Sequence, residues 1–218
     1  MNMYRRKSID RLRIIKLVFR AVLCGFVICC MLSLTKFDAQ SRSIADSVVR
    51  LHILANSDSA EDQALKLHVR NLVQELCYNM YANAETRSEA EALIQKRLPY
   101  IVENVQDEIQ KMGYDYKING ELVNMYFTNR TYGSVTLPAG YYHAVRLTIG
   151  EGKGHNWWCV MYPPICISCA EKRADISDVL DEEQTKVVTE KSYKYEFKVY
   201  ELYRDFANKI KAATENRS

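Results

Sequence analysis

The stretch that most constrains the fold is residues 137–166, LPAGYYHAVRLTIGEGKGHNWWCVMYPPIC. Residues 141–149 alternate apolar with polar or small side chains, which is the pattern of a half-buried strand. Glycines at 150, 152 and 154 then permit a backbone path that larger residues would block. Both tryptophans of the chain follow at 157 and 158, and cysteines stand at 159 and 166. We therefore look for the functional surface in this stretch first.

The N-terminus carries most of the positive charge. Residues 1–20 contain seven basic residues against Asp10, although the whole chain has a net charge of only +3. The rest of the chain is therefore mildly acidic. A nucleic-acid-binding protein needs its positive charge on the folded domain, so this charge distribution argues against nucleic-acid binding.

An uncharged apolar run, AVLCGFVICCMLSL, follows at residues 21–34. Its length suits the core of a signal peptide and falls short of the roughly 20 residues of a membrane span. The positive charge before the apolar run predicts that the N-terminus stays in the cytoplasm and that the rest of the chain is exported. Cleavage near residues 43–45, or retention as an anchor with residues 12–34 tilted into the bilayer, are both open. We predict a signal peptide or anchor with linker at 1–45, and one extracytoplasmic domain at 46–218.

The remaining pattern predicts an α+β domain. Its sheet is mostly antiparallel, and the two helices of the N-terminal half cover one face. The expected elements are a strand at 47–55, helices at about 60–81 and 88–112 with Pro99 inside the second, a strand or hairpin at 114–128, a loose acidic loop at about 170–190, a strand at 193–200 and a terminal helix at 201–213.

Export would place the later cysteines in an oxidising space. Cys159 and Cys166 can close a small loop, worth roughly 2–3 kcal/mol by the chain-entropy argument. Cys169 and Cys77 are rival partners for these cysteines, and the spacing leaves the pairing open. We favour a structural Cys159–Cys166 disulfide.

Candidate catalytic and metal sites are weak. His155 and Cys159 are residue types that can act as a general base and a nucleophile. No third group that would orient the base is evident. The four histidines fit no standard zinc spacing, and the glycine-rich residues 150–154 match no phosphate-binding loop. We therefore predict no catalytic residue, no metal and no cofactor.

Trp157 and Trp158 are adjacent, so on a strand they point to opposite faces. One can join the core, and the other is then exposed unless a partner covers it. Exposed tryptophans are common anchors of protein interfaces. The alternative is a sheet covered on both sides, with both tryptophans buried.

Two blocks of this sequence resemble a known family. They are RLHILANSDSAEDQALKLHVRNLV at residues 50–73 and the stretch at 137–166. Both are similar to the hallmark blocks of the stage II sporulation protein R family, and the resemblance covers about residues 10–170. The first block supplies a structural motif of five residues: Arg50, His52, Asn56, Ser57 and Asp58.

The resemblance implies a signalling protein of endospore formation, not an enzyme. Such a protein is exported from the forespore into the intermembrane space. There it activates the membrane aspartic protease stage II sporulation protein GA (SpoIIGA), which processes pro-sigma-E in the mother cell. We expect the contact surface to be His155, Asn156, Trp157 and Trp158, held by the Cys159–Cys166 loop.

Two other functions remain as alternatives. One is a secreted cysteine- or metal-dependent hydrolase centred on His155 and Cys159. The other is a structural protein of the cell envelope, which needs no dedicated protease partner.

Overall fold

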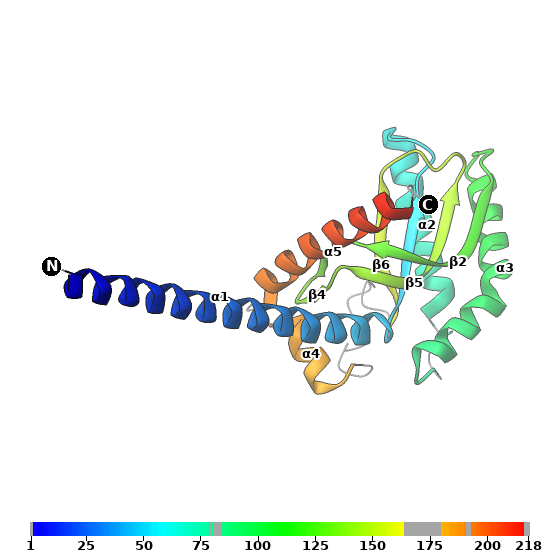
Figure 1. Cartoon of the computed structure of the whole chain (residues 1–218). Coiled ribbons are helices and arrows are strands. Elements are labelled where there is room, and N and C mark those ends of the chain that lie inside the picture. Colours follow the sequence, from blue (N-terminus) through cyan, green and yellow to red (C-terminus); the bar gives the residue numbers. More distant parts are fainter. Residues whose placement is uncertain (1, 79, 81–83, 164–179, 191–192, 216–218) are drawn as a thin grey trace. The chain divides into compact units, whose positions relative to one another are not determined.

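The computed structural model describes residues 2–78, 80, 84–163, 180–190 and 193–215 (Figure 1). The chain divides into two compact units, Met1–Gln40 and Ser41–Ser218. The first unit belongs to a single helix, and the second contains the sheet and the remaining helices.

Helix α1, Asn2–Ala45, carries the apolar N-terminal run. Its large apolar side chains from Ile14 to Leu32 are exposed. Within the described residues, one helical stretch, Ile14–Ala45, is long and apolar enough to cross a membrane, a property that signal sequences share. The linker expected before residue 46 is instead helical as far as Ala45. No proline or glycine interrupts this segment, and Ile44 is buried.

The second unit is built on a four-stranded sheet in the order β2-β5-β1-β6. The strands are β1 (Val49–Leu54), β2 (Ile118–Phe127), β5 (Gly140–Ile149) and β6 (Asn156–Tyr162). The pair β1–β5 is parallel, whereas β1–β6 and β2–β5 are antiparallel. The α+β class is thus confirmed, but the sheet is mixed, with its parallel pair at the centre. Parallel strands need a long crossover, and the two helices between β1 and β5 provide it.

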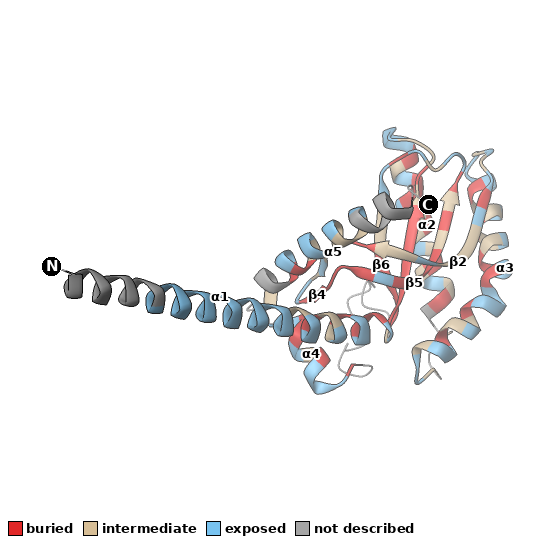
Figure 2. Cartoon of the chain, viewed as in Figure 1, coloured by how far each residue is buried: buried red, intermediate tan, exposed pale blue. Residues whose placement is uncertain are grey.

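Helices α2 (Ala60–Tyr78) and α3 (Arg87–Lys111) pack on one face of this sheet, as predicted. Figure 2 shows buried positions along both helices and the strands. The core is largely aliphatic, with Leu51 and Ile53 from β1 against Val69 of α2 and Ile101 of α3. α3 starts one residue earlier than expected, because the Thr86 side chain caps it.

Strand β2 runs unbroken through Gly120, so the hairpin alternative for residues 114–128 is wrong. A Cβ atom at Gly120 would lie 2.3 Å from Cγ2 of Val102 on α3. The glycine therefore permits close packing of helix on strand, and it makes no turn. A separate two-stranded hairpin follows, formed by β3 (Arg130–Tyr132) and β4 (Val135–Leu137).

Two predictions near the C-terminus are wrong. Part of the expected loose loop is helix α4, Glu182–Thr189, with Asp181 and Gln184 forming a capping box and Val187 and Val188 buried. Residues 170–179 of that loop lie outside the described residues. The expected strand at 193–200 belongs to helix α5, Tyr193–Glu215. Phe197 and Tyr200, both buried, are three residues apart, a helical spacing that the apparent alternation concealed.

Candidate functional site

The two sequence blocks meet where the turn after β1 packs against the connection between β5 and β6. The backbone N–H of Gly154 donates to the carbonyl oxygen of Ala55 at 2.9 Å, and that of Lys153 donates to Asn56 at 3.1 Å. Residues about 100 positions apart in sequence are thereby joined by main-chain hydrogen bonds. This junction supports the candidate site.

Glycine is required at two points of this junction. A Cβ atom at Gly154 would lie 2.1 Å from the backbone oxygen of Ser57. Because that oxygen belongs to the main chain, rotation of a side chain cannot remove the clash. Gly150 has φ +56, and its Cβ would lie 2.4 Å from Oδ1 of Asn56. The expectation that these glycines permit a special backbone path is confirmed.

Polar side chains hold the first half of the junction. Asn56 accepts a hydrogen bond from the Glu151 N–H at 3.0 Å, and its Nδ2 donates to Asp62 at 2.9 Å. The Ser57 hydroxyl also donates to Asp62, at 2.5 Å. Burial alone would raise the pKa of the Asp62 carboxyl, but the hydrogen bonds from Ser57 and Asn56 outweigh it and lower that pKa. Asp62 is therefore ionised at neutral pH and fixes the turn.

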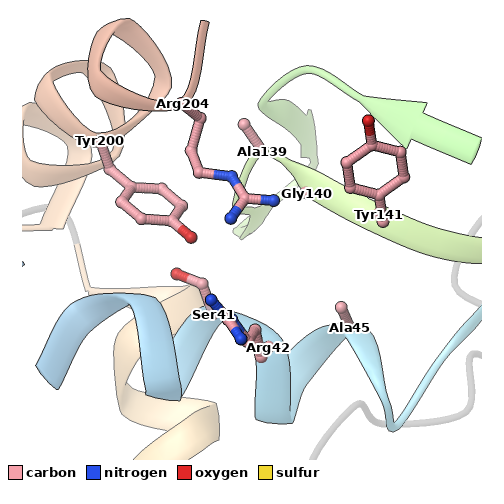
Figure 3. Close-up of a pocket in the computed structure, with 8 residues that line it drawn as sticks. All are labelled: Ser41, Arg42, Ala45, Ala139, Gly140, Tyr141, Tyr200 and Arg204. Atoms are coloured by element: carbon pink, nitrogen blue, oxygen red, sulfur yellow. The ribbon is translucent and has the colours of Figure 1, made fainter. Parts of the chain in front are cut away.

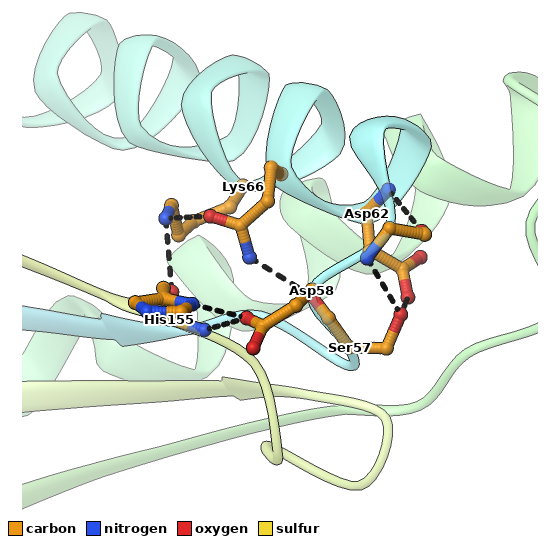
Figure 4. A network of polar contacts seen from close by, with 7 residues as sticks. Ser57, Asp58, Asp62, Lys66 and His155 are labelled. Atoms are coloured by element: carbon orange, nitrogen blue, oxygen red, sulfur yellow. Dashed lines mark hydrogen bonds and ion pairs between the residues drawn. The ribbon is translucent and has the colours of Figure 1, made fainter.

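Asp58 and His155 hold the second half at the surface (Figure 4). Oδ1 of Asp58 accepts from both the backbone N–H and Nδ1 of His155, each at 2.5 Å. The hydrogen bonds from His155 lower the pKa of the Asp58 carboxyl. Beneath them, Nζ of Lys66 donates to the His155 carbonyl oxygen at 2.9 Å. The His155 main chain is thus held from two sides while its ring remains exposed.

An open pocket of about 480 Å³ lies beside this pair. Its lining residues come from both blocks and from the β3–β4 hairpin: Asp58, Arg130, Lys153, Gly154, His155, Asn156 and Trp158. Three of the four predicted contact residues line it, and Trp157 does not. Sequence reasoning missed Arg130 and Lys153, because isolated basic residues in a short strand and in a glycine-rich connection carry no periodic signal.

The two tryptophans point to opposite faces of the sheet, as alternation predicts. Trp157 packs against the aliphatic core, with the guanidinium of Arg70 4.4 Å from its ring centroid. Trp158 stacks on the His52 ring at 3.9 Å and lies beneath Arg130 at 5.6 Å. Both tryptophans are half-buried, so only the Trp158 side contributes an aromatic surface to the pocket.

Arg50 and His52 lie under that surface. Arg50 is fully buried among aromatic rings, with its guanidinium 4.0 Å from the Phe127 centroid and 4.9 Å from that of Tyr142. It donates hydrogen bonds to the Tyr132 hydroxyl and, at 3.5 Å, to the Cys159 carbonyl oxygen. Burial lowers the pKa of the Arg50 guanidinium. These contacts place Arg50 in a supporting role behind the pocket.

His52 is 4% exposed, and it is an internal residue of the sheet. Burial, assisted by the positive charge of Arg146, lowers its pKa from 6.5 to about 4. The ring is therefore neutral at pH 7, which suits its stacking on Trp158.

The two residues proposed for a hydrolase, His155 and Cys159, lie in different environments. Cys159 is fully buried in β6, where its sulfur accepts a hydrogen bond from Gln74 at 3.6 Å. His155 is exposed and bound to Asp58. Cys166 and Cys169 lie outside the described residues, so the Cys159–Cys166 pairing stays a prediction. Within the described part of the chain, no three His, Cys, Asp or Glu side chains converge as metal ligands.

Comparison with known proteins identifies relatives of this chain. The family model for stage II sporulation protein R matches residues 45–172. The stage II sporulation protein R of Bacillus subtilis (strain 168) is 35% identical over 156 residues, which is 72% of this chain and 70% of that protein. No solved structure matches.

Proposed function

Because the chain belongs to the stage II sporulation protein R family, we propose that it is the exported signal that activates the membrane aspartic protease SpoIIGA. Activation then leads to processing of pro-sigma-E in the mother cell. The family membership supports a signalling role at stage II of sporulation. The receptor and the direction of export are the further steps of the proposal.

The observation that carries the proposal is the junction of the two blocks. Main-chain hydrogen bonds, required glycines and the Asp58–His155 pair all hold one exposed surface in place. A binding surface that is already ordered loses less conformational entropy when its partner docks. An exposed surface that is already fixed in this way suits a protein that acts by binding another protein.

The composition of the pocket suits a protein partner. Trp158 offers an aromatic anchor, while Arg130 and Lys153 are cationic and Asp58 is anionic. Aromatic anchors surrounded by polar groups are typical of the energetic centre of interfaces. We therefore place the protease contact on His155, Asn156 and Trp158, and we assign Trp157 to the core side.

Activation needs more than binding. A ligand shifts its receptor only by its differential affinity for the active and inactive arrangements. The ligand in this proposal binds the extracytoplasmic part of the protease and favours its active state. No bond in the substrate is made or broken by the ligand itself, and the burial of Cys159 supports this over the hydrolase alternative.

The apolar part of α1 supports export or anchoring. In the proposal, the basic N-terminus stays in the forespore cytoplasm, and residues 46–218 reach the intermembrane space. The domain acts there either after cleavage or while tethered to the membrane.

Adjacent tryptophans provide a matched pair for the test. Trp158→Ala removes the pocket anchor, and Trp157→Ala removes a ring of equal size from the opposite face. Secreted protein and processed sigma factor are measured separately in sporulating cells. We expect Trp158→Ala to lower processing per secreted molecule by about 30-fold, the loss typical of an interface hot spot. Trp157→Ala should lower processing only as far as it lowers the amount secreted.

Charge reversal at Lys153 is the second arm, because this side chain is exposed and forms an ion pair with its neighbour Glu151 at 2.7 Å. Lys153→Glu should be secreted normally and should weaken processing. Normal processing per molecule in both Trp158→Ala and Lys153→Glu would remove the pocket from the proposal. A purified chain that cleaves a peptide without the protease would favour the hydrolase instead.

A further inference from the structure

Helix α5 carries apolar side chains on two sides. Phe197 and Tyr200 are buried against the domain. A second row of four residues is exposed, each with 47% to 65% of its surface accessible: Val199, Leu202, Tyr203 and Phe206. The spacing of three, one and three residues puts this row on one side of the helix, and we call it the α5 stripe. A helix that is apolar on two sides requires a second apolar contact.

The carboxylates in the middle of α5 are turned away from the stripe. Glu201 accepts a hydrogen bond from Asn129 at 3.0 Å, and Asp205 accepts one from the Tyr126 hydroxyl at 3.3 Å. Both donors belong to β2 or to the loop that follows it. Lys198 and Lys209 are exposed on the helix, and Lys198 also forms an ion pair with Glu201 at 3.2 Å. Outward lysines beside an apolar row are the pattern of a helix that lies in a membrane interface.

A pocket of about 320 Å³ adjoins α5 and contains two guanidinium groups. Arg204 comes from α5 and Arg42 from the last turn of α1, and Tyr200 and Ser41 supply hydroxyl groups (Figure 3). Ser41 is only 4% exposed, and its Oγ has no hydrogen-bond partner in the described part of the chain. Guanidinium groups with a free hydroxyl donor match the oxygens of a phosphate group.

The pocket is tied closely to the apolar segment. Ser41 follows Leu34, the end of the apolar run, by seven residues. Seven residues span at most about 25 Å even when fully extended. When the apolar segment is in a bilayer, the pocket and the α5 stripe are thus within reach of the same membrane surface.

We propose that α5 is a second membrane-contact element, independent of the pocket at Trp158. The α5 stripe enters the interface of an anionic bilayer, and Arg42 and Arg204 hold a lipid phosphate. An apolar helix face with basic residues beside it adds affinity for an anionic membrane surface. The contact also fixes the face that the domain turns away from the membrane.

The test uses the full chain in vesicles that contain a photoactivatable lipid with its reactive group in the acyl chain. Mass spectrometry locates the adducts. Adducts in residues 14–34 report correct insertion and serve as the internal control. We expect further adducts within residues 199–206, more abundant in phosphatidylglycerol than in phosphatidylcholine vesicles.

Single variants separate the two parts of the surface. Leu202→Ser and Phe206→Ser should each lower adducts on α5 by about tenfold, because an apolar contact is lost, with the α1 adducts unchanged. Arg204→Gln should abolish the preference for phosphatidylglycerol. Thermal unfolding shows that each variant remains folded.

Two results would overturn the proposal, and both come from the unmodified chain, so neither depends on a variant. The first is labelling of α1 without labelling of α5 in either lipid. The second is an α5 stripe that is protected in detergent and cross-links to another copy of the chain, which would assign the stripe to a dimer.

Discussion

The two faces of the central sheet are built on different principles. The face under α2 and α3 is almost entirely aliphatic, with side chains such as Leu51, Ile53 and Val145 fully buried. The opposite face holds Arg50 and His52, from the same strand, among aromatic rings. Successive residues of β1 therefore face two different environments.

The aliphatic face stabilises the fold, whereas the opposite face supports the candidate site. On the second face, Nη1 of Arg50 and both ring nitrogens of His52 have no hydrogen-bond partner among the described residues. Buried polar groups of this kind cost stability. The same groups contact Tyr132 and Trp158, and the Tyr132 hydroxyl donates to the Trp158 carbonyl oxygen at 3.3 Å. We infer that these polar groups lower the stability of the fold but hold Tyr132 and Trp158 in position at the pocket.

The largest expected effect is on the aliphatic face. Ile53 is fully buried and pairs with Leu147 and Trp157 on the neighbouring strands. Ile53→Ala should lower the free energy of unfolding by about 4 kcal/mol, because a cavity remains where the side chain was. Ile53→Val is the matched control, at about 1 kcal/mol. Equal losses in both variants, measured by urea denaturation, would show that this face is not tightly packed.

A smaller effect is expected from Tyr132 and Arg50 on the second face. Tyr132→Phe removes an acceptor of the buried guanidinium and should cost about 2 kcal/mol. Arg50→Met replaces the buried cation by an apolar chain and should change stability by less than about 1 kcal/mol. A buried charge is harmful chiefly when it loses a partner.

The double variant completes this test. In the Arg50→Met background, Tyr132→Phe should cost about 0.5 kcal/mol, since no buried charge then needs the hydroxyl. Urea denaturation of the four proteins gives the coupling free energy. If Arg50→Met alone is as damaging as Ile53→Ala, the two faces contribute to stability in the same way, and the contrast between them fails.

Much of this contrast follows from the sequence. Apolar periodicity predicted α2 and α3, and alternation predicted that Trp157 and Trp158 separate to opposite faces. Glycines 150 and 154 indicated an unusual backbone path, and the structure supplies its reason in the close approach of Asn56 and Ser57. These signals are local, so one sequence is enough to reveal them.

The remaining features depend on contacts distant in sequence. Nothing in β1 or β5 alone indicates that they pair in parallel, because pairing direction depends on the whole crossover. Arg130 reaches the pocket only because the β3–β4 hairpin covers the second face, and Tyr132 on the same hairpin binds Arg50. Helix α5 was mistaken for a strand over residues 193–200, since aromatic residues there satisfy both periods over a short window.

The smallest expected effect is a pH dependence from His52. Its pKa is about 4 in the folded chain, below the ordinary value of 6.5. The unfolded chain therefore binds more protons between these values, and stability falls as the pH is lowered from 6.5 towards 4. His52→Phe keeps a flat ring against Trp158 and removes the titrating group. Between pH 7 and pH 5.5, the wild-type chain should lose about 1 kcal/mol more than this variant.

Urea denaturation of both proteins at the two pH values measures this difference, and the other histidines cancel because both chains contain them. If the pKa of His52 in the folded chain were instead the ordinary 6.5, both proteins would lose the same stability. Such a result would mean that water reaches the His52 ring in solution, so that the second face is open beneath Trp158. A difference of the expected size instead supports a dry, neutral His52 beneath the pocket, stacked on the ring that we propose contacts the protease.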